Sequence, residues 1–365
     1  MKQTCFHEVN LEAGAKMVEM FGFALPWEYP KGGAAEHVAT REAAGLVDLG
    51  YMAKFHITGP DSLKFLQKLL SVDVASLKIG QIRYTTLLSD QGLMVDDATI
   101  WKYKENDYVL VTGDDGDVDW IEQQAKGLSV TIVNDTFNSG ALQVQGPKAH
   151  EIMRKFTGGD PLAVKYYHFK EMKIDGHDVV VAKMSYTGSG GFEYHVFNKD
   201  ARWLWESLLK IGGPEGMIPM GQCALESLRQ ESGYLLVGND HDKTRNPLEA
   251  GIAQTIRFDK ADFNGKAALL KIAKAGIDKR IVWLRLADAT TPKTGDPILL
   301  EGEKVGTVTS GSFQPIVKKG TAVGYVDIGK LFPGLTYKIA TDGAEHKASL
   351  SLVPLFNPTG EIRRY

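Results

Sequence analysis

The C-terminal part of the chain is a succession of short segments in which apolar and polar residues alternate. After Lys279 the runs are separated by Gly, Asp and Pro, and they read IVWLRLA, DPILLEG, EKVGTVTSG, TAVGYVDI, GLTYKIAT and HKASLSLVP. Alternation with a period of two is typical of strands with one buried face, and turn residues at this spacing indicate antiparallel neighbours. Residues 279–365 are therefore predicted to form a small antiparallel β-barrel or sandwich, separate from residues 1–278.

Within residues 1–278, one pattern occurs twice. The segments ITGPDSLKFLQKL and VQGPKAHEIMRKF each place an apolar strand before Gly-Pro and an amphipathic helix after it. This repetition predicts two related α+β subdomains of similar plan. Nearer the N-terminus, we expect a short helix over Glu12 to Phe21, a loop at PWEYPKGG, and a second helix from Ala34 to Ala44.

Composition excludes several classes of function. The net charge of −3 argues against a nucleic-acid-binding protein, which would need a basic stripe. Cys5 and Cys223 are far apart and the nine histidines are scattered, so neither a disulfide framework nor a metal site is expected. The sequence contains neither an apolar signal core nor a membrane-spanning run, which predicts a cytoplasmic protein without membrane partners.

A first candidate site is the hairpin YTTLLSDQGLMVDD, which ends in Asp96 and Asp97. Side chains alternate across a strand, so these two carboxylates must point to opposite faces. One of them, beside Tyr84 and Trp101, has the chemistry to position or deprotonate a small substrate. The alternative interpretation is that the pair only ends a turn.

A second candidate is Glu193 in YTGSGGFEYHV. The glycines resemble a phosphate loop, but FEYHV continues as a strand, so a tight turn is expected instead. A carboxylate at this place can accept two parallel N–H bonds from a heterocycle that carries an amino group beside a ring N–H. The alternative is a solvent-facing glutamate on an edge strand.

Two further segments carry chemistry-bearing residues. ESLRQESGYLLVGNDHDKTRNP predicts a helix that stops at Gly233, with Arg229 paired to Glu226 or Glu231 on its surface, and then a polar loop. The loop departs from the calcium-binding pattern, because Arg245 occupies the position that requires glycine. In KYYHF, Tyr167 is expected to be half-buried on a strand, or to stack on a flat ring.

Several of these segments, taken in order, resemble the glycine-cleavage T-protein (aminomethyltransferase) and its tetrahydrofolate-dependent demethylase relatives. The resemblance runs from about residue 8 to 355 and rests on ALQVQGP, YTGSGGFE, ESLRQESGYLLVGND, NPLEAGIAQTI, DFNGKAAL and KVGTVTSGSFQP. It implies two α+β domains and a C-terminal β-barrel, arranged around a central hole that binds tetrahydrofolate. Asp97 matches the catalytic carboxylate of that family, and Glu193 matches the glutamate that binds the pterin ring. The resemblance also assigns a set of residues to the folate site, namely Tyr84, Trp101, Tyr167, Tyr186 and, near the C-terminus, Arg363 or Arg364.

The chain departs from the T-protein pattern at four places, which are Gly50-Tyr51, Ser189-Gly190, Leu225 in place of a folate-site arginine, and Gln254 in place of a tryptophan. An arginine cannot be replaced by leucine at an ion-pairing site without losing the pair. The demethylase branch also lacks this arginine.

Three hypotheses follow from the resemblance. The first is an aminomethyltransferase that takes its one-carbon unit from the lipoyl arm of a small carrier protein and forms methylenetetrahydrofolate. The second is a methyltransferase that uses a small S-, N- or O-methylated donor and forms 5-methyltetrahydrofolate. The third is a folate-binding accessory protein, against which the presence of Asp97 argues.

Overall fold

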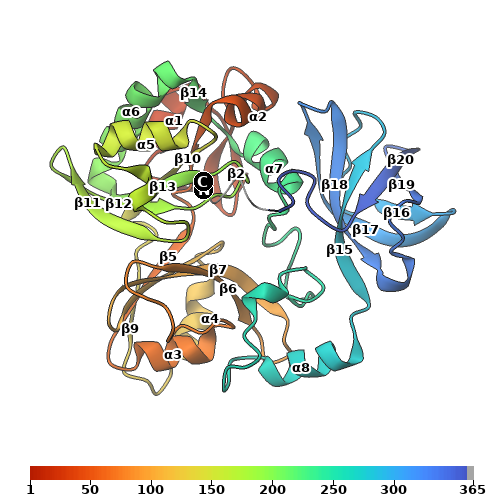
Figure 1. The fold of residues 1–365 in the computed structure, drawn as a ribbon, viewed down its shortest axis with the longest axis horizontal. Coiled ribbons are helices and arrows are strands. Elements are labelled where there is room, and N and C mark those ends of the chain that lie inside the picture. Colours follow the sequence, from red (N-terminus) through yellow and green to blue (C-terminus); the bar gives the residue numbers. More distant parts are fainter. Residues whose placement is uncertain (360–365) are drawn as a thin grey trace.

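The computed structural model describes residues 1–359 and consists of three β-sheets and a closed barrel, with helices packed around them. Figure 1 shows the arrangement: the barrel lies on the right, and the two larger sheets with their helices lie above one another on the left. The predicted mixed α+β fold with a C-terminal antiparallel barrel is confirmed. None of the helices in residues 1–359 is long and apolar enough to span a membrane.

The upper part contains a six-stranded sheet with the order β11-β12-β13-β10-β4-β14. Helices α5 and α6 both contact β13. The apolar core on this side includes Leu142, Phe192 and Trp205. The elements are β4 (Ala44–Asp48), β10 (Ser139–Gln145), α5 (Ala149–Thr157), β11 (Phe169–Ile174), β12 (His177–Lys183), β13 (Gly191–Phe197), α6 (Ala201–Gly212), β14 (Met217–Pro219) and α7 (Gln222–Glu231).

The lower part contains a five-stranded sheet with the order β6-β7-β8-β5-β9. Two helices contribute to its apolar core, which includes Phe55, Phe65 and Ile121. The elements are β5 (Ala53–Thr58), α3 (Ser62–Leu69), β6 (Ile82–Leu88), β7 (Met94–Lys104), β8 (Asp107–Thr112), α4 (Asp117–Gln124) and β9 (Thr131–Asn134).

The repeated Gly-Pro pattern marks equivalent junctions in the two parts. β5 ends just before Gly59 and β10 just before Gly146, and α3 and α5 begin three residues after the glycine. Both glycines have positive φ, 118° and 130°, where other residues are strained. A Cβ at either position would also meet a backbone carbonyl at 2.5–2.6 Å. The predicted similarity of these two junctions is therefore confirmed.

The N-terminal segment differs from the sequence-based expectation. The helix predicted over Glu12 to Phe21 is wrong: α1 (His7–Glu12) ends where that helix was expected to begin. Residues 16–28 form the hairpin of β2 (Lys16–Met20) and β3 (Phe23–Glu28), with β1 (Lys2–Gln3) beside β3. The expected loop at PWEYPKGG therefore begins in β3, and pairing between strands has overridden the local helical tendency. The second helix is present as α2 (Gly33–Glu42).

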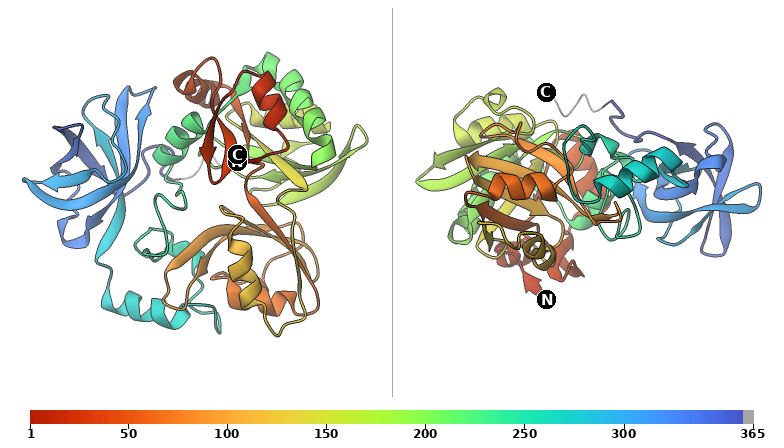
Figure 2. Two further views of the ribbon diagram at one scale, coloured as in Figure 1. Left: turned by 180° about the vertical axis from the view of Figure 1, so that it is seen from behind. Right: turned by 90° about the horizontal axis from the view of Figure 1, so that it is seen from below.

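The barrel follows helix α8 (Lys266–Ala275). Seen from behind, the chain leaves α8 and runs upward into the barrel (Figure 2). Its strands close in the order β15-β18-β17-β16-β19-β20. They are β15 (Lys279–Leu286), β16 (Pro297–Leu300), β17 (Glu303–Gln314), β18 (Lys319–Asp327), β19 (Thr336–Thr341) and β20 (Ala344–Ser351).

Two apolar clusters join the three parts. The first lies between the two large sheets and includes Trp101, Phe169 and Ala182. The second joins the β6–β7 hairpin to the barrel, and it includes Leu88, Met94, Leu235, Ile281 and Tyr325. Because buried cores are close-packed, the first cluster fixes the two sheets relative to each other, and the second fixes the hairpin relative to the barrel.

Candidate active site

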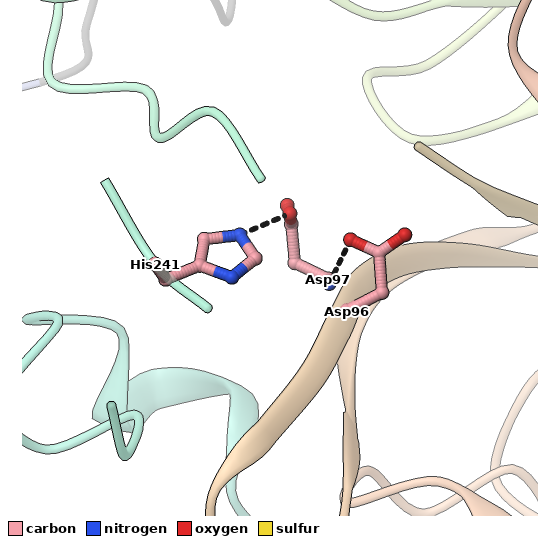
Figure 3. Close-up of side chains that lie close together, drawn as sticks. All are labelled: Asp96, Asp97 and His241. Carbon is pink, nitrogen blue, oxygen red and sulfur yellow. Dashed lines mark hydrogen bonds and ion pairs between the residues drawn. The ribbon is translucent and has the colours of Figure 1, made fainter. Parts of the chain in front are cut away.

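The two adjacent carboxylates on β7 point to opposite faces of the strand, as predicted (Figure 3). Asp96 is fully buried, and its oxygens accept hydrogen bonds from the backbone N–H groups of Asp97 (2.7 Å) and Gly113 (2.9 Å). Asp97 keeps 22% of its side chain exposed. Asp96 therefore has a structural role, since it binds backbone N–H groups, and Asp97 is the carboxylate that a substrate can reach.

Asp96 also shares its surroundings with Asp117 at the start of α4. Burial raises the pKa of Asp96 well above its usual range, and the charges of Asp97 and Asp117 add to this effect. Burial likewise raises the pKa of Asp117 to about 6, against which hydrogen bonds to Asp96 and Thr112 act. Two carboxylates this close cannot both ionise easily. Together with burial, this disfavours a negative charge on Asp96 beside Asp97.

Asp97 has a partner far away in the sequence. His241 Nε2 lies 2.8 Å from Asp97 Oδ1, and the histidine side chain is completely buried. Figure 3 shows the imidazole pointing toward Asp97, while the carboxylate of Asp96 is directed away from it. The other ring nitrogen, Nδ1, has no hydrogen-bond partner among residues 1–359.

The loop that carries His241 is anchored by the buried carboxylate of Asp240. This carboxylate forms an ion pair with Arg229 and accepts hydrogen bonds from Thr309 (2.5 Å) and Ser310 (2.8 Å) on β17. The Tyr325 hydroxyl donates to the Asp240 carbonyl at 2.7 Å. The barrel therefore determines where this loop, and with it His241, is placed.

Arg229 is more deeply placed than the sequence suggested. The predicted pair with Glu226 is present, with Nη2 and Oε2 2.7 Å apart, but the guanidinium is fully buried and not on the helix surface. Burial acts to lower the pKa of Arg229, but the charges of Asp240 and Glu226 outweigh it and raise the pKa well above its usual value. The other predicted partner, Glu231, pairs with Arg41 instead.

Two half-buried tyrosines, Tyr84 and Tyr186, lie close enough to Asp97 to sense its charge. Burial raises the pKa of Tyr84 well above its usual range. The charge of Asp97 and a hydrogen bond to Asp97 raise it further. Burial also raises the pKa of Tyr186, where the charge of Arg229 opposes the shift and those of Glu226 and Asp97 add to it. The Tyr186 hydroxyl donates to the carbonyl of Leu235 at 2.5 Å. Tyr84 and Tyr186, two predicted site residues, are thus both within reach of the charge of Asp97.

Glu193 lies on β13 with 8% of its surface exposed, so it is not a solvent-facing residue of an edge strand. Its Oε1 accepts a hydrogen bond from Gln143 Nε2 at 2.7 Å, and its Oε2 lies 3.2 Å from His195 Nε2. A carboxylate has about four acceptor positions. Each oxygen therefore keeps capacity for one further donor, which fits the bidentate contact suggested by the sequence.

The two other predicted aromatic residues within residues 1–359 occupy different environments. Trp101 is 2% exposed, donates Nε1–H to Thr99 at 2.9 Å, and meets the ring of His195 edge-on at a centroid distance of 5.0 Å. Both rings line a pocket of about 690 Å³. Tyr167 lies in a turn before β11, with φ of 56°, so its predicted strand position is wrong. Tyr167 also contributes to the raised pKa of Tyr84, after burial and Asp97. Arg363 and Arg364 lie outside the described residues.

Asp96, Asp97 and His241 each offer a ligand atom, and these atoms lie within 4.8 Å of one another. We assign no metal ion to them, because the carboxylate of Asp96 is directed away from His241 (Figure 3), whose Nε2 lies at hydrogen-bond distance, 2.8 Å, from Asp97 Oδ1. The geometry instead describes a histidine that is hydrogen bonded to one carboxylate.

Comparison with known proteins gives a consistent result across the chain. The family model of the GCVT N-terminal domain matches residues 6–260, and that of the glycine cleavage T-protein C-terminal barrel domain matches residues 279–357. The chain belongs to the glycine-cleavage T-protein family. An aminomethyltransferase of Halothermothrix orenii is 35% identical over 92% of this chain and 94% of its own length. One from Porphyromonas gingivalis is 35% identical over 97% of this chain and 99% of its own.

A solved T-protein has the same overall structure. The glycine cleavage system aminomethyltransferase T from Bartonella henselae superposes with a TM-score of 0.90 at 29% identity, covering 98% of both chains. Two of the departures from the family pattern, Tyr51 and Leu225, share one buried apolar cluster, against which Tyr186 packs. The other two lie elsewhere: Ser189 is hydrogen bonded to Arg41, and Gln254 is exposed.

Sequence reasoning missed His241, Gln143 and His195 as partners of the predicted carboxylates. Gln143 and His195 had a local signal, because His195 is two residues after Glu193 and so shares its face of the strand. For His241 the only signal was its place between two aspartates, in a loop that was recognised as polar but not connected to the hairpin.

Proposed function

We propose that this T-protein family member is a tetrahydrofolate-dependent aminomethyltransferase. In this proposal, the one-carbon unit comes from an aminomethyl group on the lipoyl arm of a carrier protein, ammonia is released, and methylenetetrahydrofolate is formed in the cytoplasm. The observation that carries the proposal is the partly exposed carboxylate of Asp97 near the half-buried Tyr84 and Tyr186, in a chain that matches named aminomethyltransferases over nearly its full length.

Asp97 has the properties that this reaction needs. When ammonia departs, positive charge develops on the carbon to which it was bound. A fixed carboxylate in a site with little water stabilises that charge. The same carboxylate can accept a proton from the attacking nitrogen. The hydrogen bonds to His241 and Tyr84 hold Asp97 in one orientation before any substrate arrives.

The described residues fit a bound reduced folate. Tetrahydrofolate supplies the nitrogen nucleophile that receives the one-carbon unit. Glu193, with acceptor capacity left on each oxygen, would hold the donor edge of the pterin, and Tyr84 and Tyr186 would contribute aromatic surface. Trp101 is proposed to support this site through its contact with His195.

The proposal is tested by the identity of the product. The protein is incubated with tetrahydrofolate and an aminomethylated lipoyl carrier protein, and ammonia and methylenetetrahydrofolate are measured together. We expect both in equal amounts. Formation of 5-methyltetrahydrofolate from S-, N- or O-methylated donors, without ammonia release, would instead establish a methyltransferase and overturn the proposal.

The role of Asp97 is tested by Asp97→Asn, which removes the charge and keeps the shape. We expect turnover to fall by about 10²–10³-fold, the scale of one lost electrostatic contact in a transition state. Asp90→Asn is the matched control, because Asp90 is an exposed residue of the same hairpin. Full turnover by Asp97→Asn would reject the role.

A further inference from the structure

We propose that His241 is the positioning residue of the active site, and that it holds Asp97 by donating its Nε2–H to Oδ1. Because a carboxylate has about four acceptor positions, Asp97 then keeps capacity for a substrate donor. The inference rests on the proposed function, because it assumes that Asp97 is the acting carboxylate. His241 itself neither gains nor loses the transferred proton.

The contact has the geometry of a charge-assisted hydrogen bond. The distance of 2.8 Å from Nε2 to Oδ1 lies within the range of such bonds, which are roughly twice as strong as neutral ones. With Nε2 as the donor, Nδ1 of a neutral imidazole is an acceptor, and this atom is buried without a partner among residues 1–359. An unsatisfied buried polar atom destabilises the folded state, because its hydrogen bonds to water are lost and not replaced. A histidine that only filled space would gain nothing to offset this cost.

The position of His241 is determined from outside the sheet that carries Asp97. The preceding residue, Asp240, is fixed by Arg229 and by Ser310 of the barrel. The loop also closes on itself, because Gly238 N–H donates to the His241 carbonyl at 2.8 Å. The rigid loop brings the imidazole to Asp97, and the barrel thereby contributes to the orientation of a carboxylate on β7.

The hydrogen-bond partners of Asp97 differ in kind from those of the neighbouring Asp96. Asp96 accepts hydrogen bonds from two backbone N–H groups, those of Asp97 and Gly113. Both donors belong to the backbone of its own sheet or to the residue directly after one of its strands. Asp97 is hydrogen bonded to His241, which belongs to a loop 144 residues further along the chain. Preorganisation of a reacting group by partners on a rigid support is what efficient catalysis requires.

The protonation state of His241 can be tested without any turnover. The protein is labelled with ¹⁵N-histidine, and the His241 signals are identified by their absence in His241→Gln. We expect a proton on Nε2 in the folded wild-type protein. A bare Nε2 with the proton only on Nδ1 would overturn the proposal, whether or not the enzyme transfers aminomethyl groups.

The kinetic test uses two variants that differ in one property. His241→Leu has no donor, and His241→Gln can place an amide N–H near the position of Nε2. We expect His241→Leu to lower kcat by about 10–100-fold, the scale of a misplaced catalytic group, with tetrahydrofolate affinity changed less than about threefold. His241→Gln should stay within about threefold of wild type, because it retains the hydrogen bond. Equal losses in the two variants, or wild-type kcat in His241→Leu, would contradict the proposal.

A double-mutant cycle separates positioning from general damage. If His241 acts through Asp97, adding His241→Leu to Asp97→Asn should lower the rate further by less than about twofold, because coupled residues are not additive. The same fold loss in both backgrounds would show that His241 acts independently, and would overturn the inference.

Discussion

The two carboxylates proposed for the active site are supported in different ways. Glu193 is held by Gln143 on the neighbouring strand and by His195 on its own strand, so its environment belongs to one sheet. Asp97 is held by His241, which reaches it from a loop anchored on the barrel. Glu193 therefore takes both of its hydrogen bonds from its own sheet, whereas the hydrogen bond from His241 to Asp97 comes from a loop anchored on the barrel. Binding and chemistry are expected to respond differently when contacts between the parts are weakened.

The largest effect is expected from the buried ion pair that anchors the loop. Arg229→Met leaves the carboxylate of Asp240 buried and unpaired, which typically lowers the free energy of unfolding by about 3–5 kcal/mol. The measurement is urea unfolding, combined with kcat of the folded fraction. If the loop transmits the position of the barrel to Asp97, kcat should fall while the affinity for tetrahydrofolate at Glu193 is largely kept.

The matched control is Arg202→Met, which removes an arginine of similar geometry from a solvent-exposed pair with Glu12. Exposed pairs contribute little to stability, so no measurable change in unfolding is expected. A similar loss in both variants would show that the buried pair has no special role and would remove the proposed difference between the two carboxylates.

A smaller effect on stability is expected from Asp117, which lies beside Asp96, the neighbour of Asp97 on β7. Because burial raises the pKa of Asp117 to about 6 from its ordinary value of 3.8, the folded state holds a proton that the unfolded chain releases. Its ionisation therefore costs stability increasingly as pH rises through this window, and the cost is fully present above pH 6. Asp117→Asn should be more stable than wild type at pH 8, by on the order of 1–3 kcal/mol, and the difference should vanish near pH 4.

Urea unfolding at several pH values measures this difference. Asp119→Asn on the same helix is the control, because Asp119 is exposed. Equal stability of Asp117→Asn and wild type at every pH would show that the fold does not raise the pKa of Asp117.

The features predicted correctly from the sequence are those with local causes. The alternating runs of residues 279–354 predicted the strands of the barrel. The repeated Gly-Pro pattern predicted equivalent strand-to-helix junctions at Gly59 and Gly146, because glycine with positive φ is needed there. The opposite directions of Asp96 and Asp97 follow from strand alternation alone. The division of the chain at residue 278 stays a prediction.

The features that sequence reasoning missed depend on distant contacts. The hairpin of β2 and β3 replaced an expected helix because its stability comes from pairing between strands. Arg229 was expected at the surface because a helical pattern does not reveal that the barrel covers that face. His241 could not be connected to Asp97 because their contact requires the barrel and the lower sheet to be placed first.

The most direct test of the division between the two carboxylates is equilibrium binding of tetrahydrofolate to Glu193→Gln and Asp97→Asn. We expect Glu193→Gln to weaken binding by about 10–100-fold, the scale of hydrogen bonds to a charged group, and Asp97→Asn to change it by less than about threefold. Tight binding by Glu193→Gln together with weak binding by Asp97→Asn would contradict the account.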